Sequence, residues 1–164
     1  MKSLIIYASI IVSFLLISNQ SKAQDYQTAV GIKAGGYENG LSVKYFSTKD
    51  IALEGILGIR KHGVVITGLY EIHQQAFGLA ELKFYYGAGA HIGAVGAGNY
   101  QTFAGSGQFY TKSQILLGAD GVIGLEYIIP QSPIALSLDL NPRVELASGP
   151  FFDIAPGLGI KYTF

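Results

Sequence analysis

The chain has 164 residues, no cysteine, a formal net charge of zero and a charged fraction of only 13%. This length predicts a single domain, the missing cysteines exclude a disulfide framework, and the balanced charge argues against a nucleic-acid partner. An ordinary soluble domain has about 25% charged residues. This chain, with 49% hydrophobic residues and 22 glycines, has too few charges to cover a water-exposed surface.

Residues 1–23 have the parts of a secretory signal peptide. Lys2 gives a positive start, residues 4–17 are almost uninterrupted apolar sequence, and the segment ends in small residues at Ala23. The apolar run, about 14 residues, is shorter than the roughly 20 that a membrane-spanning helix needs. We therefore expect cleavage after Ala23 and a mature domain of residues 24–164.

Beyond the signal segment, apolar residues recur at every second position, which predicts β-strands. Eight strands are expected, over residues 28–36, 40–47, 51–60, 64–73, 81–93, 113–128, 134–146 and 151–164. Most connections contain short turn signals, such as Asn39-Gly40 and the two prolines of residues 130–133. Residues 74–80 form a longer linker, and residues 94–112 lose the alternation and predict one long loop.

The charged residues of these strands all fall on the parity of the small residues, opposite the bulky apolar ones. They are Lys33, Lys44, Glu54, Arg60, Glu71, Glu81, Lys83, Asp120, Glu126, Asp139, Arg143, Glu145, Asp153 and Lys161. An even number of antiparallel strands can close into a ring, so the fold class is all-β, an eight-stranded antiparallel up-and-down transmembrane β-barrel. The charges then form a lumen polar network of mutual pairs, with glycines making room for the long side chains. A ring of eight strands is filled by side chains, so the lumen is expected to be plugged.

The last strand places Ile160, Tyr162 and the terminal Phe164 on one parity. This pattern resembles the C-terminal assembly signal that the barrel-assembly machinery of Gram-negative bacteria reads. Aromatic residues at strand ends are expected to form two belts at the membrane surfaces. The periplasmic belt would contain Tyr45, Phe46, Tyr127, Tyr162 and Phe164, and the outer belt Phe109, Tyr110 and Phe152.

The chain resembles the small eight-stranded outer-membrane barrel proteins of the OmpA-transmembrane-domain and OmpX type. The stretches ALEGILGIRKHGVVITGLYEIH, FYYGAGAHIG and GADGVIGLEYII also resemble a Bacteroidota outer-membrane protein family. The resemblance implies an integral protein of the cell outer membrane, surrounded by lipid and inserted by the assembly machinery. We expect a monomer with a structural or surface-recognition role.

No catalytic, cofactor-binding or metal-binding residues are predicted, and we do not expect an enzyme. The glycine-rich residues 87–98 lack the Lys-Ser/Thr pair and the helix of a phosphate loop, and His62, His73 and His91 have no metal-ligand spacing. Two alternatives to the structural role stay open. One is a narrow pore, and the other is a lipid-modifying hydrolase.

The hydrolase alternative combines His91 with Ser106 or Ser113 and with Glu145, all near the outer end. A further feature is the loop 94–112 itself. It mixes Gly, Ser, Gln and Asn with four aromatic residues, a composition that suits recognition of a ligand at the cell surface. The four are Tyr100, Phe103, Phe109 and Tyr110.

Overall fold

The computed structural model describes residues 26–36, 39–60, 62–100, 103, 107–148 and 151–164, so the expected signal peptide lies outside the described residues. Ten strands are present in this part of the chain. They are β1 (Thr28–Gly35), β2 (Asn39–Phe46), β3 (Ile51–Arg60), β4 (Gly63–Ala76), β5 (Leu79–Val95), β6 (Gly98–Tyr100), β7 (Gln108–Tyr110), β8 (Gln114–Ile128), β9 (Ile134–Glu145) and β10 (Phe151–Thr163). Within the described residues, no helix has the length and apolar character needed to cross a membrane.

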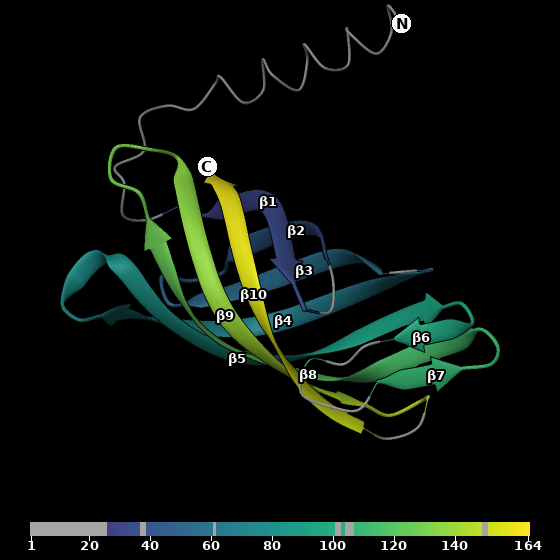
Figure 1. The fold of residues 1–164 in the computed structure, drawn as a ribbon. Coiled ribbons are helices and arrows are strands. Elements are labelled where there is room, and N and C mark those ends of the chain that lie inside the picture. Colours follow the sequence, from purple (N-terminus) through teal and green to yellow (C-terminus); the bar gives the residue numbers. More distant parts are fainter. Residues whose placement is uncertain (1–25, 37–38, 61, 101–102, 104–106, 149–150) are drawn as a thin grey trace, which may run out of the picture.

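Eight of the strands close into a ring in the order β1-β10-β9-β8-β5-β4-β3-β2. Every neighbouring pair is antiparallel, and the ring closes where Val30 of β1 lies opposite Tyr162 of β10. The start of β1 and the end of β10 therefore share one end of the barrel, the terminal end. The small β6-β7 sheet projects from the opposite end of the barrel, which we call the hairpin end (Figure 1). The expected eight-stranded antiparallel barrel is confirmed, with strand boundaries close to the predicted ones.

The prediction of a linker at residues 74–80 is wrong, because β4 continues to Ala76 and β5 begins at Leu79. Only Phe77 and Gly78 remain between them, with φ angles of 53° and 72°. Two successive residues with positive φ are typical of a type I′ hairpin turn, whose twist matches that of the flanking strands. The polar pair Gln74-Gln75 suggested a loop, but the neighbouring strand β5 pairs with both residues.

The loop 94–112 also contains structure that the alternation did not predict. β6 and β7 pair as a hairpin, Gly98 opposite Tyr110. The Tyr100 and Tyr110 rings pack 5.5 Å apart, and the Tyr110 hydroxyl lies 2.9 Å from Ser148 Oγ. These two tyrosines therefore attach the hairpin to the barrel, whereas Phe103 and Phe109 stay exposed.

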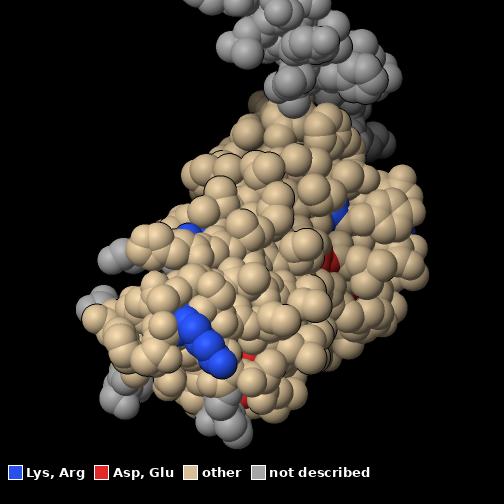
Figure 2. Space-filling view, turned by 90° about the vertical axis from the view of Figure 1, so that its right-hand side faces the viewer, with Lys and Arg blue, Asp and Glu red and all other residues tan. Residues whose placement is uncertain are grey.

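The two faces of the barrel wall have opposite polarity, as the parity of the strands predicted. Large apolar side chains on the outer face are exposed, among them Ile59 at 65% and Leu158 at 61%. Few Lys, Arg, Asp or Glu atoms reach the surface on the side that Figure 2 shows. The buried side chains fill the lumen, and most of its large ones are polar or charged.

Most rings predicted for the two aromatic belts face outward, but two do not, and the position of the rings at membrane surfaces stays a prediction. Tyr45, Tyr127 and Phe164 are exposed at the terminal end, and Tyr162 is half-buried beside Phe164. Phe109 and Phe152 are exposed at the hairpin end. Phe46 and Tyr110, in contrast, are only 6% and 7% exposed. Phe46 lies on the inward parity of β2, and the β6-β7 hairpin turns Tyr110 over the lumen.

Candidate functional site in the barrel lumen

The candidate site is the set of charged side chains inside the ring. Of the predicted lumen residues, Lys33, Lys44, Glu54, Glu71, Asp120, Glu126, Asp139, Arg143, Glu145, Asp153 and Lys161 are buried. Arg60, Glu81 and Lys83 are half-buried near the strand ends. Because these residues occupy alternate positions on six or more strands, ring closure points all of them inward.

Along the barrel axis, an apolar cluster lies near each end and charged layers lie between them. β8 passes through all of them. From the terminal end to the hairpin end, its buried inward residues other than glycine are Ile128, Glu126, Val122, Asp120 and Leu116. Ile128 belongs to an apolar cluster with Tyr26, Ala29, Phe46, Ala52 and Ala135 at the terminal end. Leu116 packs with Val65, Val95 and Tyr110 at the hairpin end.

The first charged layer, the Lys44 cluster, comprises Lys44, Glu54, Glu71, His73, Glu126 and Lys161. Lys44 Nζ lies 3.2, 2.8 and 3.1 Å from carboxylate oxygens of Glu54, Glu71 and Glu126, and all four side chains are fully buried. Lys161 Nζ adds a second cation 3.2 Å from Glu54, and His73 contacts Glu71 at 3.0 Å. One ammonium therefore holds together three strands, β3, β4 and β8.

A second group of polar side chains lies farther along the lumen. Lys33 Nζ is 3.0 Å from Asp139, and the Tyr85 hydroxyl donates to the same carboxylate at 2.6 Å. Asn141 also donates to Asp139. A carboxylate can accept several hydrogen bonds at once, so Asp139 links β1, β5 and β9.

The charged layer nearest the hairpin end, the His91 cluster, comprises His91, Asp120, Arg143 and Glu145. His91 Nδ1 lies 2.8 Å from Asp120, and His91 Nε2 lies 3.0 Å from Glu145. Arg143 donates to Asp120 and to Thr67. The other Glu145 oxygen accepts the backbone N–H groups of Leu117 and Ala147. This cluster therefore joins β4, β5, β8 and β9.

The geometry of His91 does not favour the hydrolase alternative. A catalytic base needs a ring nitrogen that faces the nucleophile, and both nitrogens of His91 face carboxylates. Ser113 is exposed, and Ser106 lies outside the described residues. No group of three or more His, Cys, Asp or Glu side chains among the described residues could hold a metal ion.

Lumen glycines provide the space that these long side chains occupy. A Cβ at Gly118 would lie 2.6 Å from His91 Cε1, and one at Gly124 would lie 2.8 Å from the Tyr85 ring. A Cβ at Gly157 would lie 3.0 Å from Lys33 Cε. The first two contacts are closer than real Cβ atoms show and the third is unusually tight, so each glycine leaves room for a long side chain of the neighbouring strand.

Replacing Gly118 by alanine should lower the free energy of unfolding by about 1–3 kcal/mol, the usual cost of overpacking. The added methyl group meets His91 and the Val144 carbonyl. Gly68→Ala is the matched control, because a Cβ there meets nothing within 4 Å. Urea titrations of the folded barrel in detergent provide the measurement. Equal stability of the two variants would contradict this role of Gly118.

Sequence reasoning missed several members of the site. Tyr26 precedes the first predicted strand, yet its hydroxyl donates to Glu126 at 2.6 Å. Burial, reinforced by the Glu126 carboxylate, raises the pKa of Tyr26 well above its ordinary 10.0, so the hydroxyl keeps the proton that it donates. Ser42 and Tyr85 do lie on the inward parity, so their position alone could have placed them in the lumen, where they donate to Glu54 and Asp139.

The residues of the expected assembly signal lie together on the outer face of β10. Ile160 and Phe164 are 52% and 45% exposed, and the Tyr162 and Phe164 rings lie 4.9 Å apart. Their recognition by assembly machinery stays a prediction.

An apolar outer wall around buried charged side chains defines this protein as an eight-stranded β-barrel of reversed polarity. Its structure is similar to the crystal structure of the N-terminal β-barrel domain of OprF from Pseudomonas aeruginosa, with a TM-score of 0.58. The two sequences are 21% identical, and the match covers 85% of this chain and 100% of that one. No protein-family model and no curated protein matches the chain. The expected likeness to OmpA-type barrels is thereby confirmed for the fold.

Proposed function

We propose that the mature chain is an integral outer-membrane β-barrel with a closed lumen and a structural role. The observation that carries this proposal is the reversed polarity of the wall. Lys44, Glu54 and Glu126 are 0–2% exposed inside, whereas Ile32, Leu57 and Ile66 are 45–58% exposed outside. Exposed apolar patches on a soluble monomer are normally limited to a few hundred Å². A hydrocarbon layer is the environment that removes this much apolar surface from water.

The packing of the interior supports the closed state. Apolar clusters lie at both ends of the lumen, and ion pairs fill the layers between them. A pocket of about 40 Å³ lies beside the charged groups, partly open to solvent and lined in part by Lys33, Thr67, Asn141 and Arg143. It has room for about three water molecules. A structural barrel thus accounts for the interior better than the narrow-pore alternative.

Surface recognition remains a second candidate. It now depends on Phe103 and Phe109, which are 64% and 66% exposed, because Tyr100 and Tyr110 pack against the barrel.

The purified mature chain should need detergent to stay soluble and should show heat-modifiable gel mobility with a β-type circular dichroism spectrum. In planar bilayers it should show no sustained large conductance, because the lumen is filled. A monomer that stays soluble without detergent would contradict the membrane location. Steady porin-like current steps would contradict the closed lumen only.

A further inference from the structure

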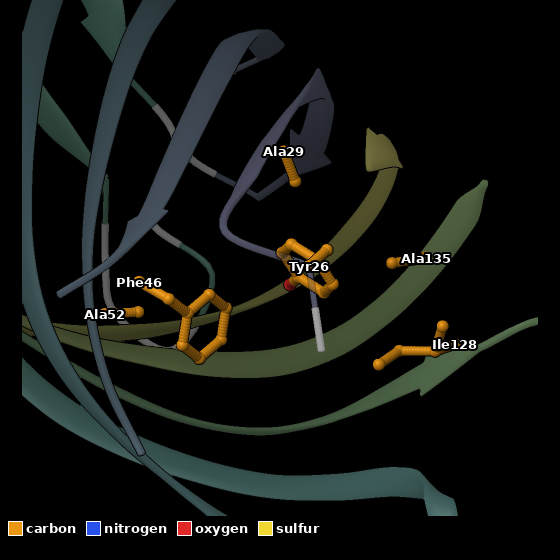
Figure 3. Close-up of a cluster of buried hydrophobic side chains, with 6 residues drawn as sticks. All are labelled: Tyr26, Ala29, Phe46, Ala52, Ile128 and Ala135. Carbon is orange, nitrogen blue, oxygen red and sulfur yellow. The ribbon is translucent and has the colours of Figure 1, made fainter. Parts of the chain in front are cut away.

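The terminal end of the lumen is filled by a side chain that belongs to none of the barrel strands. Tyr26 precedes β1, yet only 9% of it is exposed. The backbone of the next residue fixes its direction. Gln27 N donates to Phe164 O at 3.1 Å, and Phe46 N donates to Gln27 O at 2.8 Å. Gln27 is therefore held between β10 and β2, and the Tyr26 ring is turned into the mouth of the lumen (Figure 3).

The wall around this ring is built from small residues. Ala29, Ala52 and Ala135 come from β1, β3 and β9, and they are 0%, 0% and 1% exposed. Three alanines leave space in a lumen that long side chains fill elsewhere, and the Tyr26 and Phe46 rings occupy that space. The two rings meet edge to face, 5.0 Å apart at an interplanar angle of 88°, a favourable geometry for an aromatic pair.

Beyond the ring lies the most highly charged layer of the barrel. The Tyr26 hydroxyl donates to Glu126 Oε1, and Lys44 holds the other oxygen of the same carboxylate. Lys44 and Glu126 are fully buried. The ring thus separates the solvent at the terminal end from an ion cluster that is stable only in its paired, enclosed form.

We propose that Tyr26 is an intramolecular stopper that closes the terminal mouth of the lumen to solvent and small solutes. The proposal rests on the closed lumen of the proposed function and names the residue that closes one end of it. Tyr26 is outside the strand ladder, so its side chain can leave the mouth without breaking a strand pair of the barrel. Opening and closing of this end of the lumen then depend on Tyr26 and Gln27, the two described residues before β1.

A single thiol placed behind the stopper can report whether the mouth is closed. Ser137 is the next inward residue after Ala135 on β9, is 5% exposed, and has no hydrogen-bond partner at Oγ. Ser137→Cys is nearly isosteric, and the chain has no cysteine of its own. The folded protein in detergent is treated with a small cationic methanethiosulfonate reagent, and mass spectrometry gives the labelling rate.

In the parent Ser137→Cys protein, labelling should be slow, and Tyr26→Ala should accelerate it by about tenfold or more, because local opening is no longer required. Tyr26→Phe keeps the ring and should label as slowly as the parent. The matched control is Tyr127→Ala, which removes a ring from the outer face at the same end, 42% exposed. It should not change the rate.

Two results would overturn the stopper. A folded Tyr26→Ala protein that labels as slowly as the parent would show that other residues close the mouth. Equal acceleration by Tyr127→Ala would show general loosening of this end instead. If Tyr26→Ala does not fold, Tyr26→Leu gives the same comparison with a smaller loss of volume. Fast labelling of the parent itself would instead contradict the closed lumen of the proposed function.

Discussion

Leu138→Arg should lower the free energy of unfolding in a bilayer by about 2–4 kcal/mol, the cost of a cation at the middle of a barrel exterior. Leu138 is 56% exposed on the outer face of β9. It lies opposite Leu125 of β8 and Leu158 of β10, so an arginine there has only apolar neighbours across the strands. Folding titrations in phospholipid vesicles measure the effect.

Leu138→Ile is the control, since it keeps an apolar side chain of the same volume at the same site. It should change the free energy of unfolding by less than about 1.5 kcal/mol. If both variants are tolerated equally, the outer face of β9 does not contact hydrocarbon and the assignment of the two faces is wrong.

The second large effect is expected inside the lumen. Lys44→Met should destabilise the barrel by about 3–5 kcal/mol, because it leaves buried carboxylates without their cation. Glu54, Glu71 and Glu126 all contact the Lys44 ammonium, and all are fully buried. Urea titrations of the barrel in detergent provide the measurement. Lys112→Met, at an exposed position, is the matched control and should have little effect.

A double variant tests the reason for that loss. Glu126→Gln removes one of the three negative charges, so the Lys44→Met/Glu126→Gln protein should recover part of the stability that Lys44→Met loses. Non-additive effects of this kind are expected for residues of one ion-pair network. A Lys44→Met protein as stable as the Lys112→Met control would show that the Lys44 cluster does not depend on its central cation.

The sequence by itself determined which side chains point into the barrel and which point out. Side-chain direction in a strand depends only on the parity of the position, so Lys44, Glu126 and Arg143 could be assigned to the lumen without any knowledge of their neighbours. The prolines of residues 130–133 are an equally local signal, and the chain does turn there, whereas Asn39-Gly40, predicted as a turn, lies inside β2 and pairs with β1. Such local signals made the number of barrel strands, most of their boundaries and the fold class predictable, but not the β4–β5 turn or the β6-β7 hairpin.

The tertiary structure alone decided which side chains meet across the lumen. Lys44 and Glu126 lie 82 residues apart, and their contact depends on the tilt and stagger of the closed ring, which alternation does not encode. The contacts of His91 with Asp120 and Glu145, and the space that Gly118 leaves beside His91, likewise depend on how the strands align in the closed ring. Tyr26 and the β6-β7 hairpin lie outside the alternating segments, so packing against the completed barrel, rather than any strand pattern, places their side chains at its two ends.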